Sequence, residues 1–507
     1  MDAIREKITL TSKTFEKCIK CGVETGVIVP DKKPDVLRIL QADAVSAVRK
    51  YSATEGKLLI EGTVCVTVIY LPENSEEKIK SISTSIPFNE VVTSNEINDE
   101  AHYSVNSEIS EVNIQLVNSR KLNINCIVEL KVDVNSEKTF TFVSTVECEK
   151  AACRYTRADI DCMKECRTSD FLIKDSIEVR NGAPQISEIL KCDLRIEDKE
   201  AKAVTNKVVF EGTVAANVLY ISTAGTVEQC EASLPFTDVI EFDESCEDND
   251  INVGCDIIES NIKAEFNADG EKRNIIFELL VSAEASTYRQ ESIQYLSDCY
   301  YFGYETKVNR EFITNRQTRR CPRVTKNVRE CIAFDSRMPA PSSVYNVVIN
   351  PVVKEIECNK EMAEINTELE VCILYLSENE NNPICCMKHK IPLTYMHKKA
   401  GDCELYANVE CEHISYSINM NGELELRAVI GYSVEETSEV KLEIVCDVEK
   451  GVKGGNSEFV IMYATGEEDL WDIGKKYRVS CDEIAQINHV EPNQKPIKGQ
   501  RLLIPCL

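Results

Sequence analysis

The chain of 507 residues contains one motif three times, and this repetition constrains its fold more than any other feature. Each copy is an apolar run that ends in a tyrosine, and Tyr70, Tyr220 and Tyr375 lie 150 and 155 residues apart. A proline with following apolar residues precedes each run, and a polar turn with a short apolar end follows it. The prolines are Pro34, Pro184 and Pro341, and the apolar ends are residues 86–88, 234–236 and 391–393. Three markers in one order predict three copies of one module.

Each copy has the periodicity of β structure. Side chains alternate along the run before each tyrosine, and further alternating runs close the copies near residues 124–130, 275–281 and 424–430. In the third copy Asn421-Gly422 predicts a β-hairpin, because both residues tolerate positive φ. A module of roughly 120 residues is long enough to bury its own core as a sandwich or a curled sheet. The strand order stays open.

The repeated residues indicate a structural motif rather than a catalytic one. Tyrosine, proline and the apolar pattern recur, whereas a repeated active site would repeat serine, histidine, aspartate or cysteine. The chain has five histidines, which are too few and too poorly paired with cysteines for Cys-His or zinc hydrolysis. We therefore predict no catalytic residues and no enzyme activity.

The 24 cysteines are best understood together with the N-terminus. The first 18 residues carry charges where a signal peptide needs an apolar stretch, and no segment approaches the roughly 20 apolar residues of a membrane span. We expect the chain to stay where it is made, with thiols that are free at first and can cross-link later in oxidising surroundings. Cys18 and Cys21 form a CxxC without a second such pair, and a structural zinc site needs four ligands. We predict no metal site and no cofactor.

The stretches 148–166 and 300–321 connect the modules and carry cysteines and basic residues. They are consistent with short helices or with linkers. Cys162 and Cys166 have a spacing that on a helix would suit a metal or a disulfide, although ordinary surface thiols explain them more simply.

The formal charge is −27, from 85 acidic and 58 basic residues. Such a chain is repelled by nucleic acid and by anionic membrane surfaces, so we predict neither as a partner and no membrane insertion. The acidity serves either solubility alone or the selection of basic partners.

The pattern changes after Val448, where glycines at 451, 454 and 455 predict a flexible joint. The last 50 residues then have the order strand, helix, helix, strand. The strands are expected at 459–466 and 501–505, the first helix at 470–477, and the second after a capping-box sequence at 480–483. We expect the second helix to carry Ile484 and Ile487 inward.

This C-terminal stretch resembles a LysM domain over its whole length. The matching residues are Leu470, Trp471, Ile473, Lys475, Lys476, Tyr477, Val479, Ser480, Glu483, Ile484, Asn488, Ile497, Gly499, Gln500, Leu502, Ile504 and Pro505. The resemblance implies binding of N-acetylglucosamine-containing glycans by the loops after the first strand and before the second. The first loop departs from the family, because Gly-Glu-Glu-Asp-Leu at 466–470 is longer and more acidic than the usual Gly-Asp-Thr-Leu.

That loop leads to a predicted partner-binding site. Its residues are Glu467, Glu468, Asp469, Leu470 and Trp471. Carboxylates suit a basic or polar protein surface better than a sugar, and an exposed Trp471 would anchor such an interface. Alternatively, Trp471 fills the small core of the domain.

The whole chain resembles the SPOCS-domain spore coat morphogenetic proteins of endospore-forming bacteria, which end in a LysM domain. We predict a mainly β fold with sandwich-like SPOCS modules at 1–148, 165–290 and 324–448, followed by a small α+β LysM domain at 458–507. The resemblance implies a non-enzymatic assembly protein of the mother-cell cytoplasm that is recruited to the forespore surface. Its LysM domain would bind a SpoIVA-like coat ATPase, and its β modules would bind other coat proteins.

Other functions fit the sequence less well. A peptidoglycan- or glycan-binding protein of the wall or cortex is the main alternative, because LysM domains usually bind sugars. A LysM-anchored hydrolase would need a catalytic module, and none is recognisable. A thiol-rich metal buffer is disfavoured because the cysteines are scattered.

Overall fold

The computed structural model describes residues 3–73, 78–180, 182–379, 384–454, 459–492 and 494–505. Within these ranges most of the chain is β strand, and two short helices lie near the C-terminal end. The predicted mainly β fold with a small α+β domain is therefore confirmed. No helix of the described residues is long and apolar enough to cross a membrane.

Each of the three modules is a pair of antiparallel sheets whose inner faces form one core. The first module contains β1 (Ala3–Ile28), β2 (Val36–Thr54), β3 (Lys57–Pro72), β4 (Lys80–Thr93), β5 (His102–Asn118) and β6 (Lys121–Val146). One sheet has the order β1-β6-β5 and the other β2-β3-β4. The sandwich alternative of the sequence analysis is thus the observed one.

The second and third modules repeat this topology. The second contains β7 (Ala151–Glu178), β8 (Ile186–Val204), β9 (Lys207–Ser222), β10 (Val227–Glu241), β11 (Asp250–Phe266) and β12 (Lys272–Tyr301). The third contains β13 (Tyr304–Arg320), β14 (Val324–Ile332), β15 (Pro341–Cys358), β16 (Met362–Ser377), β17 (Ile384–Lys398), β18 (Glu404–Ile418) and β19 (Leu424–Lys453). Here the strand equivalent to β1 is divided into β13 and β14, which both pair with β19. Pro322 lies at the break and has no N–H to donate to the ladder.

The repeated tyrosine and proline meet inside each of two sandwiches. The buried Tyr70 donates its hydroxyl to the carbonyl of Pro34 at 3.1 Å, and Tyr375 donates to the carbonyl of Pro339 at 3.2 Å. Both pairs are 36 residues apart. The third proline marker is therefore Pro339, and the assignment of Pro341 from sequence was wrong by two residues.

The hairpin predicted at Asn421-Gly422 is confirmed between β18 and β19. The amide of Gly422 donates to the carbonyl of Asn419, and Asn419 N–H donates to Glu423. Only Gly422 has positive φ, at 76°, so the turn is longer than the two-residue type expected.

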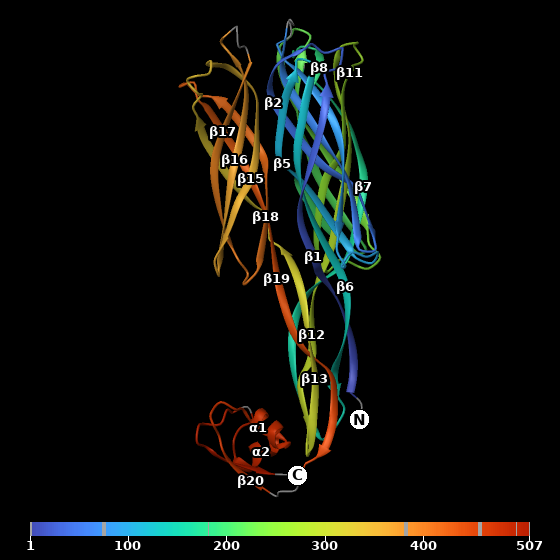
Figure 1. The fold of residues 1–507 in the computed structure, drawn as a ribbon, viewed down its shortest axis with the longest axis vertical. Helices are drawn as coiled ribbons and strands as arrows, with labels where there is room; N and C mark the ends of the chain where they lie inside the picture. The colour runs from blue at the N-terminus through green and yellow to red at the C-terminus, as the bar shows by residue number, and fades with distance from the viewer. Residues whose placement is uncertain are drawn as a thin grey trace.

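Three long hairpins leave the sandwiches together and form a stalk (Figure 1). They are β1 with β6, β7 with β12, and β13 with β19. Their shared core is built from Ile8, Leu10, Phe142, Ile160, Cys162, Tyr295, Ile313, Leu442 and Ile444. The stretches 148–166 and 300–321 are thus mostly stalk strands, and the expectation of helices or linkers there was wrong. A strand in this stalk buries every second residue, as Ile160 and Cys162 show.

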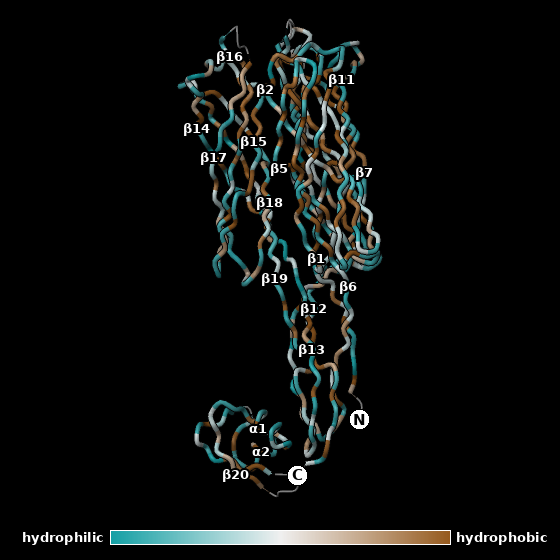
Figure 2. The backbone as a smooth tube through the Cα atoms, viewed as in Figure 1, coloured by the Kyte–Doolittle hydropathy of each residue, from teal (hydrophilic) through white to brown (hydrophobic). Residues whose placement is uncertain are grey.

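The other end of the molecule also joins all three modules. Ile69, Leu219 and Leu374 each precede a marker tyrosine, and all three lie in one buried cluster. Each module thus contributes the equivalent residue to one cluster that holds the three sandwiches together. Figure 2 shows hydrophobic and hydrophilic stretches alternating along the sandwich strands, as this packing requires.

The cysteines of the CxxC do not converge. Cys18 and Cys21 lie three residues apart on β1, so their side chains point to opposite faces of the sheet. This arrangement prevents them from sharing one metal ion.

Candidate functional site

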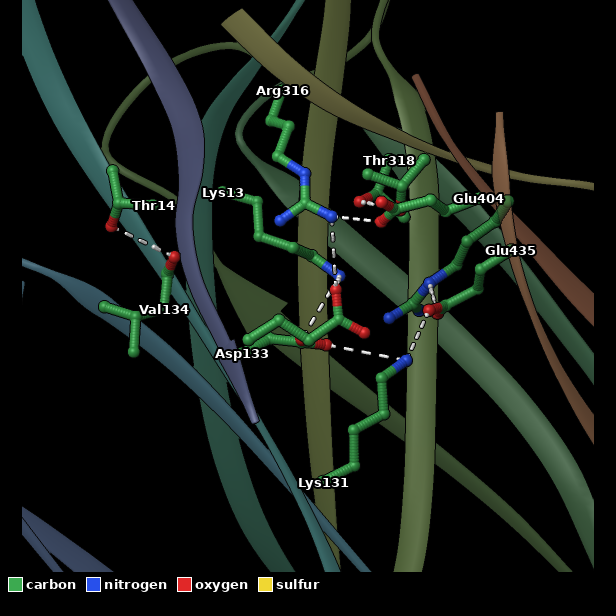
Figure 3. A network of polar contacts seen from close by, with 12 residues as sticks. Lys13, Thr14, Lys131, Asp133, Val134, Arg316, Thr318, Glu404 and Glu435 are labelled. Carbon is green, nitrogen blue, oxygen red and sulfur yellow. Dashed lines mark hydrogen bonds and ion pairs between the residues drawn. The ribbon is translucent and has the colours of Figure 1, made fainter. Parts of the chain in front are cut away.

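Two polar cavities of about 60 and 300 Å³ lie where the modules meet at the top of the stalk. Lys13 and Lys131 of the first module lie 3.1 and 3.7 Å from Asp133, and Lys131 also pairs with Glu435 of the third module at 3.0 Å. Figure 3 shows this network, together with the pair that Arg316 forms with Glu404.

The Glu435 carboxylate in this junction is matched by basic side chains. Burial alone would raise the pKa of Glu435, but Arg320 and Lys131 outweigh it and hold that pKa below its usual value. The carboxylate therefore stays ionised and paired. The junction is best explained as an ion-pair network that fixes the third module to the first.

The C-terminal domain is the better candidate for a binding site. It consists of β20 (Phe459–Tyr463), α1 (Leu470–Tyr477), α2 (Cys481–Asn488) and β21 (Arg501–Pro505), with β20 antiparallel to β21. Its core contains Met462, Ala464, Leu470, Ile473, Val479, Ile484, Ala485, Leu502 and Ile504. The predicted strand-helix-helix-strand order is observed.

One expected core residue of this domain is not buried. Ile484 is buried as predicted, but Ile487 is 38% exposed. Ala485 takes the second inward position on α2 instead. The eight-residue helix therefore presents adjacent residues to the core rather than residues one turn apart.

The predicted loop residues have different surroundings. Glu467 is exposed, and Glu468 accepts a hydrogen bond from the hydroxyl of Thr465 at 3.1 Å. Asp469 is the N-cap of α1, and it accepts from the amide of Asp472 at 2.8 Å. The side chain of Asp472 accepts from the Asp469 amide in return, which completes a capping box.

Leu470 is only 2% exposed and belongs to the domain core. Its side chain packs in the core and holds the end of the loop there, so it is not available to a partner. The structure thus keeps three acidic residues of the predicted site at the surface and places this leucine underneath them.

Trp471 lies between two parts of the chain. Its Nε1–H donates to Asp298 Oδ2 at 3.1 Å, and its ring packs edge-to-face on Tyr300 with centroids 5.0 Å apart. The guanidinium of Arg154 covers the indole at 4.7 Å and also pairs with Asp469 at 2.8 Å. The indole is partly buried against the stalk, which differs from both environments considered for it.

The tip of the stalk holds the C-terminal domain through further contacts. Asp298 also pairs with Lys475 at 2.6 Å. The buried hydroxyl of Tyr300 donates to the carbonyl of Val479 at 2.9 Å, and the Gly303 amide donates to the carbonyl of Arg478 at 2.7 Å. Burial raises the pKa of Tyr300, so this hydroxyl keeps its proton.

Sequence reasoning missed the stalk residues that receive the domain. The one signal was the aromatic run at 300–302, which we assigned to a connection.

The glycine joint also differs from expectation. Gly451 lies within β19, and the amide of Gly454 donates to Gly303, so both are held in place. Residue 455 lies outside the described residues.

The outer face of the β20–β21 sheet is apolar. Phe459, Ile461 and Tyr463 are 58, 60 and 67% exposed, and they alternate with the inward residues of β20. Leu503 of β21 lies opposite Ile461 on the same face. This outer face and the acidic loop that follows it are the exposed surfaces of the domain that could receive a partner.

Comparison with family models assigns these parts. The SipL, SPOCS domain model matches residues 35–117, 185–265 and 342–419, and the LysM domain model matches residues 466–505. The chain carries three SPOCS domains and one LysM domain. No match was found among curated proteins.

Each SPOCS match covers four strands of a sandwich. The first runs from the start of β2 to the end of β5, and the others run over β8–β11 and β15–β18. The hairpins that complete the sandwiches and build the stalk lie outside the matches. SPOCS and LysM domains are non-catalytic binding domains, and LysM domains typically bind glycans such as N-acetylglucosamine. The SPOCS family is related to sporulation.

Proposed function

We propose that this protein is a non-enzymatic assembly protein of the spore coat. In this proposal the LysM domain binds a SpoIVA-like coat ATPase on the forespore, and the SPOCS modules bind other coat proteins. The chain is made in the mother-cell cytoplasm and is recruited from there to the forespore surface.

The observation that carries the proposal is the separation of the two kinds of domain. The SPOCS sandwiches lie at one end of an elongated molecule, and the LysM domain lies beside the far end of the stalk (Figure 1). The 30 residues of β12 alone extend about 100 Å at about 3.3 Å per residue. Such a shape suits a linker between two protein layers better than it suits an enzyme.

We assign the ATPase-binding surface to the acidic loop of the LysM domain. Glu467 and Glu468 offer carboxylates to a basic or polar protein surface, Asp469 holds the loop by capping α1 and pairing with Arg154, and the apolar outer face of β20 continues this surface. Trp471 and Leu470 do not contact the partner in this proposal. Trp471 fixes α1 to the stalk, and Leu470 fixes the loop to the core.

A side-by-side binding assay tests the proposal. The full-length chain is titrated with the purified SpoIVA-like ATPase and, separately, with peptidoglycan fragments. We expect Glu467→Lys/Glu468→Lys to weaken ATPase binding at least about tenfold, because it reverses two charges that face the partner. The matched control is Glu244→Lys/Glu247→Lys, which reverses two exposed charges in the second module and should bind normally.

Two outcomes would contradict the proposal. One is tight binding of peptidoglycan without binding of the ATPase, which would support the glycan-binding alternative. The other is time-dependent release of soluble fragments from peptidoglycan or chitin oligomers, which would show hydrolase activity.

A further inference from the structure

The third module contains a thiol, an imidazole and a carboxylate that converge between its two sheets. Cys321 lies at the break between β13 and β14, His397 lies near the end of β17, and Glu436 lies in β19. Their ligand atoms all lie within 4.8 Å of one another. His397 and Glu436 are 7 and 3% exposed.

His397 and Glu436 replace apolar core residues of the first module. The position of His397, four residues after the apolar end of the motif, is occupied by the buried Val92 and Ile240 in the first two modules. Counted from the closing hairpin, the position of Glu436 corresponds to the buried Val134 of the first module. Relative to the first module, the third has exchanged two aliphatic core residues for two polar ones, and the second module has the buried Thr287 at the position of Glu436.

Burying a carboxylate in an apolar core lowers the stability of the fold unless a partner of opposite charge or hydrogen-bond donors compensate its charge. The Glu436 carboxylate accepts from the Ala400 amide at 3.1 Å and lies 3.0 Å from His397 Nε2. Among the described residues His397 is its only ion-pair partner, and no lysine or arginine pairs with it. A bound cation would satisfy the carboxylate and would explain why these residue types meet here.

The geometry separates a metal site from a catalytic triad of the same composition. In a triad the nucleophile and the carboxylate contact different ring nitrogens of the histidine. Here Cys321 Sγ at 3.7 Å and Glu436 Oε1 at 3.0 Å both approach Nε2. Ligands of one tetrahedral Zn²⁺ would be separated by about 3.6 Å for sulfur and nitrogen and about 3.4 Å for nitrogen and oxygen. Small side-chain movements would therefore admit an ion between the three atoms.

We propose that Cys321, His397 and Glu436 bind one Zn²⁺ ion that ties the two sheets of the third module together. A mixed thiolate, imidazole and carboxylate set suits zinc. The converging group supplies three ligands, and Cys403, just before β18, is our candidate for the fourth. Burial and Glu436 raise the pKa of Cys321, and the nearby Cys403 adds to the effect, so zinc binding would release the thiol proton.

Zinc content of the full-length chain tests this site. The protein is stripped with a chelator, reloaded with Zn²⁺ in the presence of a weak competing chelator, and analysed by elemental mass spectrometry. We expect about one tightly held ion per chain and a higher melting temperature with zinc. Substitution with Co²⁺ should give the thiolate charge-transfer band and the visible bands of a tetrahedral site.

The informative variant is His397→Val/Glu436→Val, which restores the core that the first module already uses. We expect it to stay folded, to lose the tight ion and to show no melting shift with zinc. Cys321→Ser should also lose the cobalt–thiolate band, whereas the exposed control Cys331→Ser should keep it. The proposal is overturned if the wild-type chain retains no zinc against the weak chelator. It is equally overturned if the double valine variant binds zinc as the wild type does.

Discussion

Trp471 is the only tryptophan of the chain, and its indole joins the LysM domain to the stalk. The acceptor of its N–H, Asp298, is 173 residues away in sequence and also receives Lys475 and Arg310. One carboxylate thus gathers three donors from two elements. Hydrogen bonds to a charged group are stronger than neutral ones, so this residue should dominate the docking contact.

Replacing Asp298 by alanine should release the LysM domain without unfolding it. The loss of the two charge-assisted contacts that reach α1, from Trp471 and Lys475, should weaken docking by about 2 kcal/mol. Trp471 then becomes accessible, so its fluorescence should shift to longer wavelength and be quenched more strongly by acrylamide, with an unchanged circular dichroism spectrum. Asp269→Ala, in an exposed turn of the second module, is the control. Unchanged fluorescence of Asp298→Ala would show that the docked arrangement does not depend on this carboxylate.

The described cysteines are free thiols, but one pair is ready to react. Cys372 and Cys386 lie on neighbouring strands with their sulfur atoms 3.0 Å apart. The hydrogen bond from Cys372, with a smaller contribution from Lys388, lowers the pKa of Cys386 and favours its thiolate.

Mild oxidation with diamide should therefore link Cys372 to Cys386 first. Each disulfide removes two protons and two electrons, which the diamide accepts. Non-reducing peptide mapping should find this link before any other intramolecular disulfide, and Cys372→Ser should abolish it. Faster oxidation of another pair would contradict the assignment, and mostly disulfide-bonded protein at isolation would contradict the expectation of free thiols.

At the scale of elements, the central strands β3 and β9 share a glycine that faces a phenylalanine. Gly62 lies opposite Phe88, and Gly212 lies opposite Phe236. A Cβ on Gly62 would lie 2.2 Å from the Phe88 ring and 2.8 Å from the Ala47 carbonyl. The ring covers the glycine backbone, so this position has no room for a side chain.

Gly62→Ala should destabilise the first module by about 1–3 kcal/mol, because the ring and the neighbouring strand must both move. Gly254→Ala is the matched control, since Gly254 lies in β11 with nothing within 4 Å of an added Cβ. Urea unfolding of both variants would measure the difference. Equal urea midpoints for the two variants would contradict this prediction and show that the Phe88 ring can move aside at little cost in stability.

At the scale of the whole molecule, sequence patterns predicted the local structure of each module but not how distant segments pack together. The alternating runs and the tyrosine motif predicted the β modules, and the C-terminal pattern predicted the LysM fold, because these signals lie within one element or one hairpin. The stalk could not be predicted in this way. Its core brings together Ile8, Tyr295 and Leu442, which only the folded hairpins make neighbours.

The same limit applies to the binding site. The acidic loop was visible in sequence, but the partner of Trp471 lies on a distant hairpin, and Cys321, His397 and Glu436 are separated by 76 and 39 residues. Spacing rules detect ligands that share a strand or a turn, and here the ligands come from two strands and from the break between two others.

The central claim is that the LysM domain attaches the molecule to the forespore and that the SPOCS body does not need it to fold. Among the described residues, no LysM residue belongs to the cores of the three sandwiches, so a chain that ends after residue 454 should keep its circular dichroism spectrum and melting temperature. The decisive measurement is the position of fluorescent fusions in sporulating cells that lack the native protein. We expect the full-length fusion to surround the forespore and the shortened fusion to stay spread through the mother cell. A shortened chain that surrounds the forespore as completely as the full-length one would contradict the account.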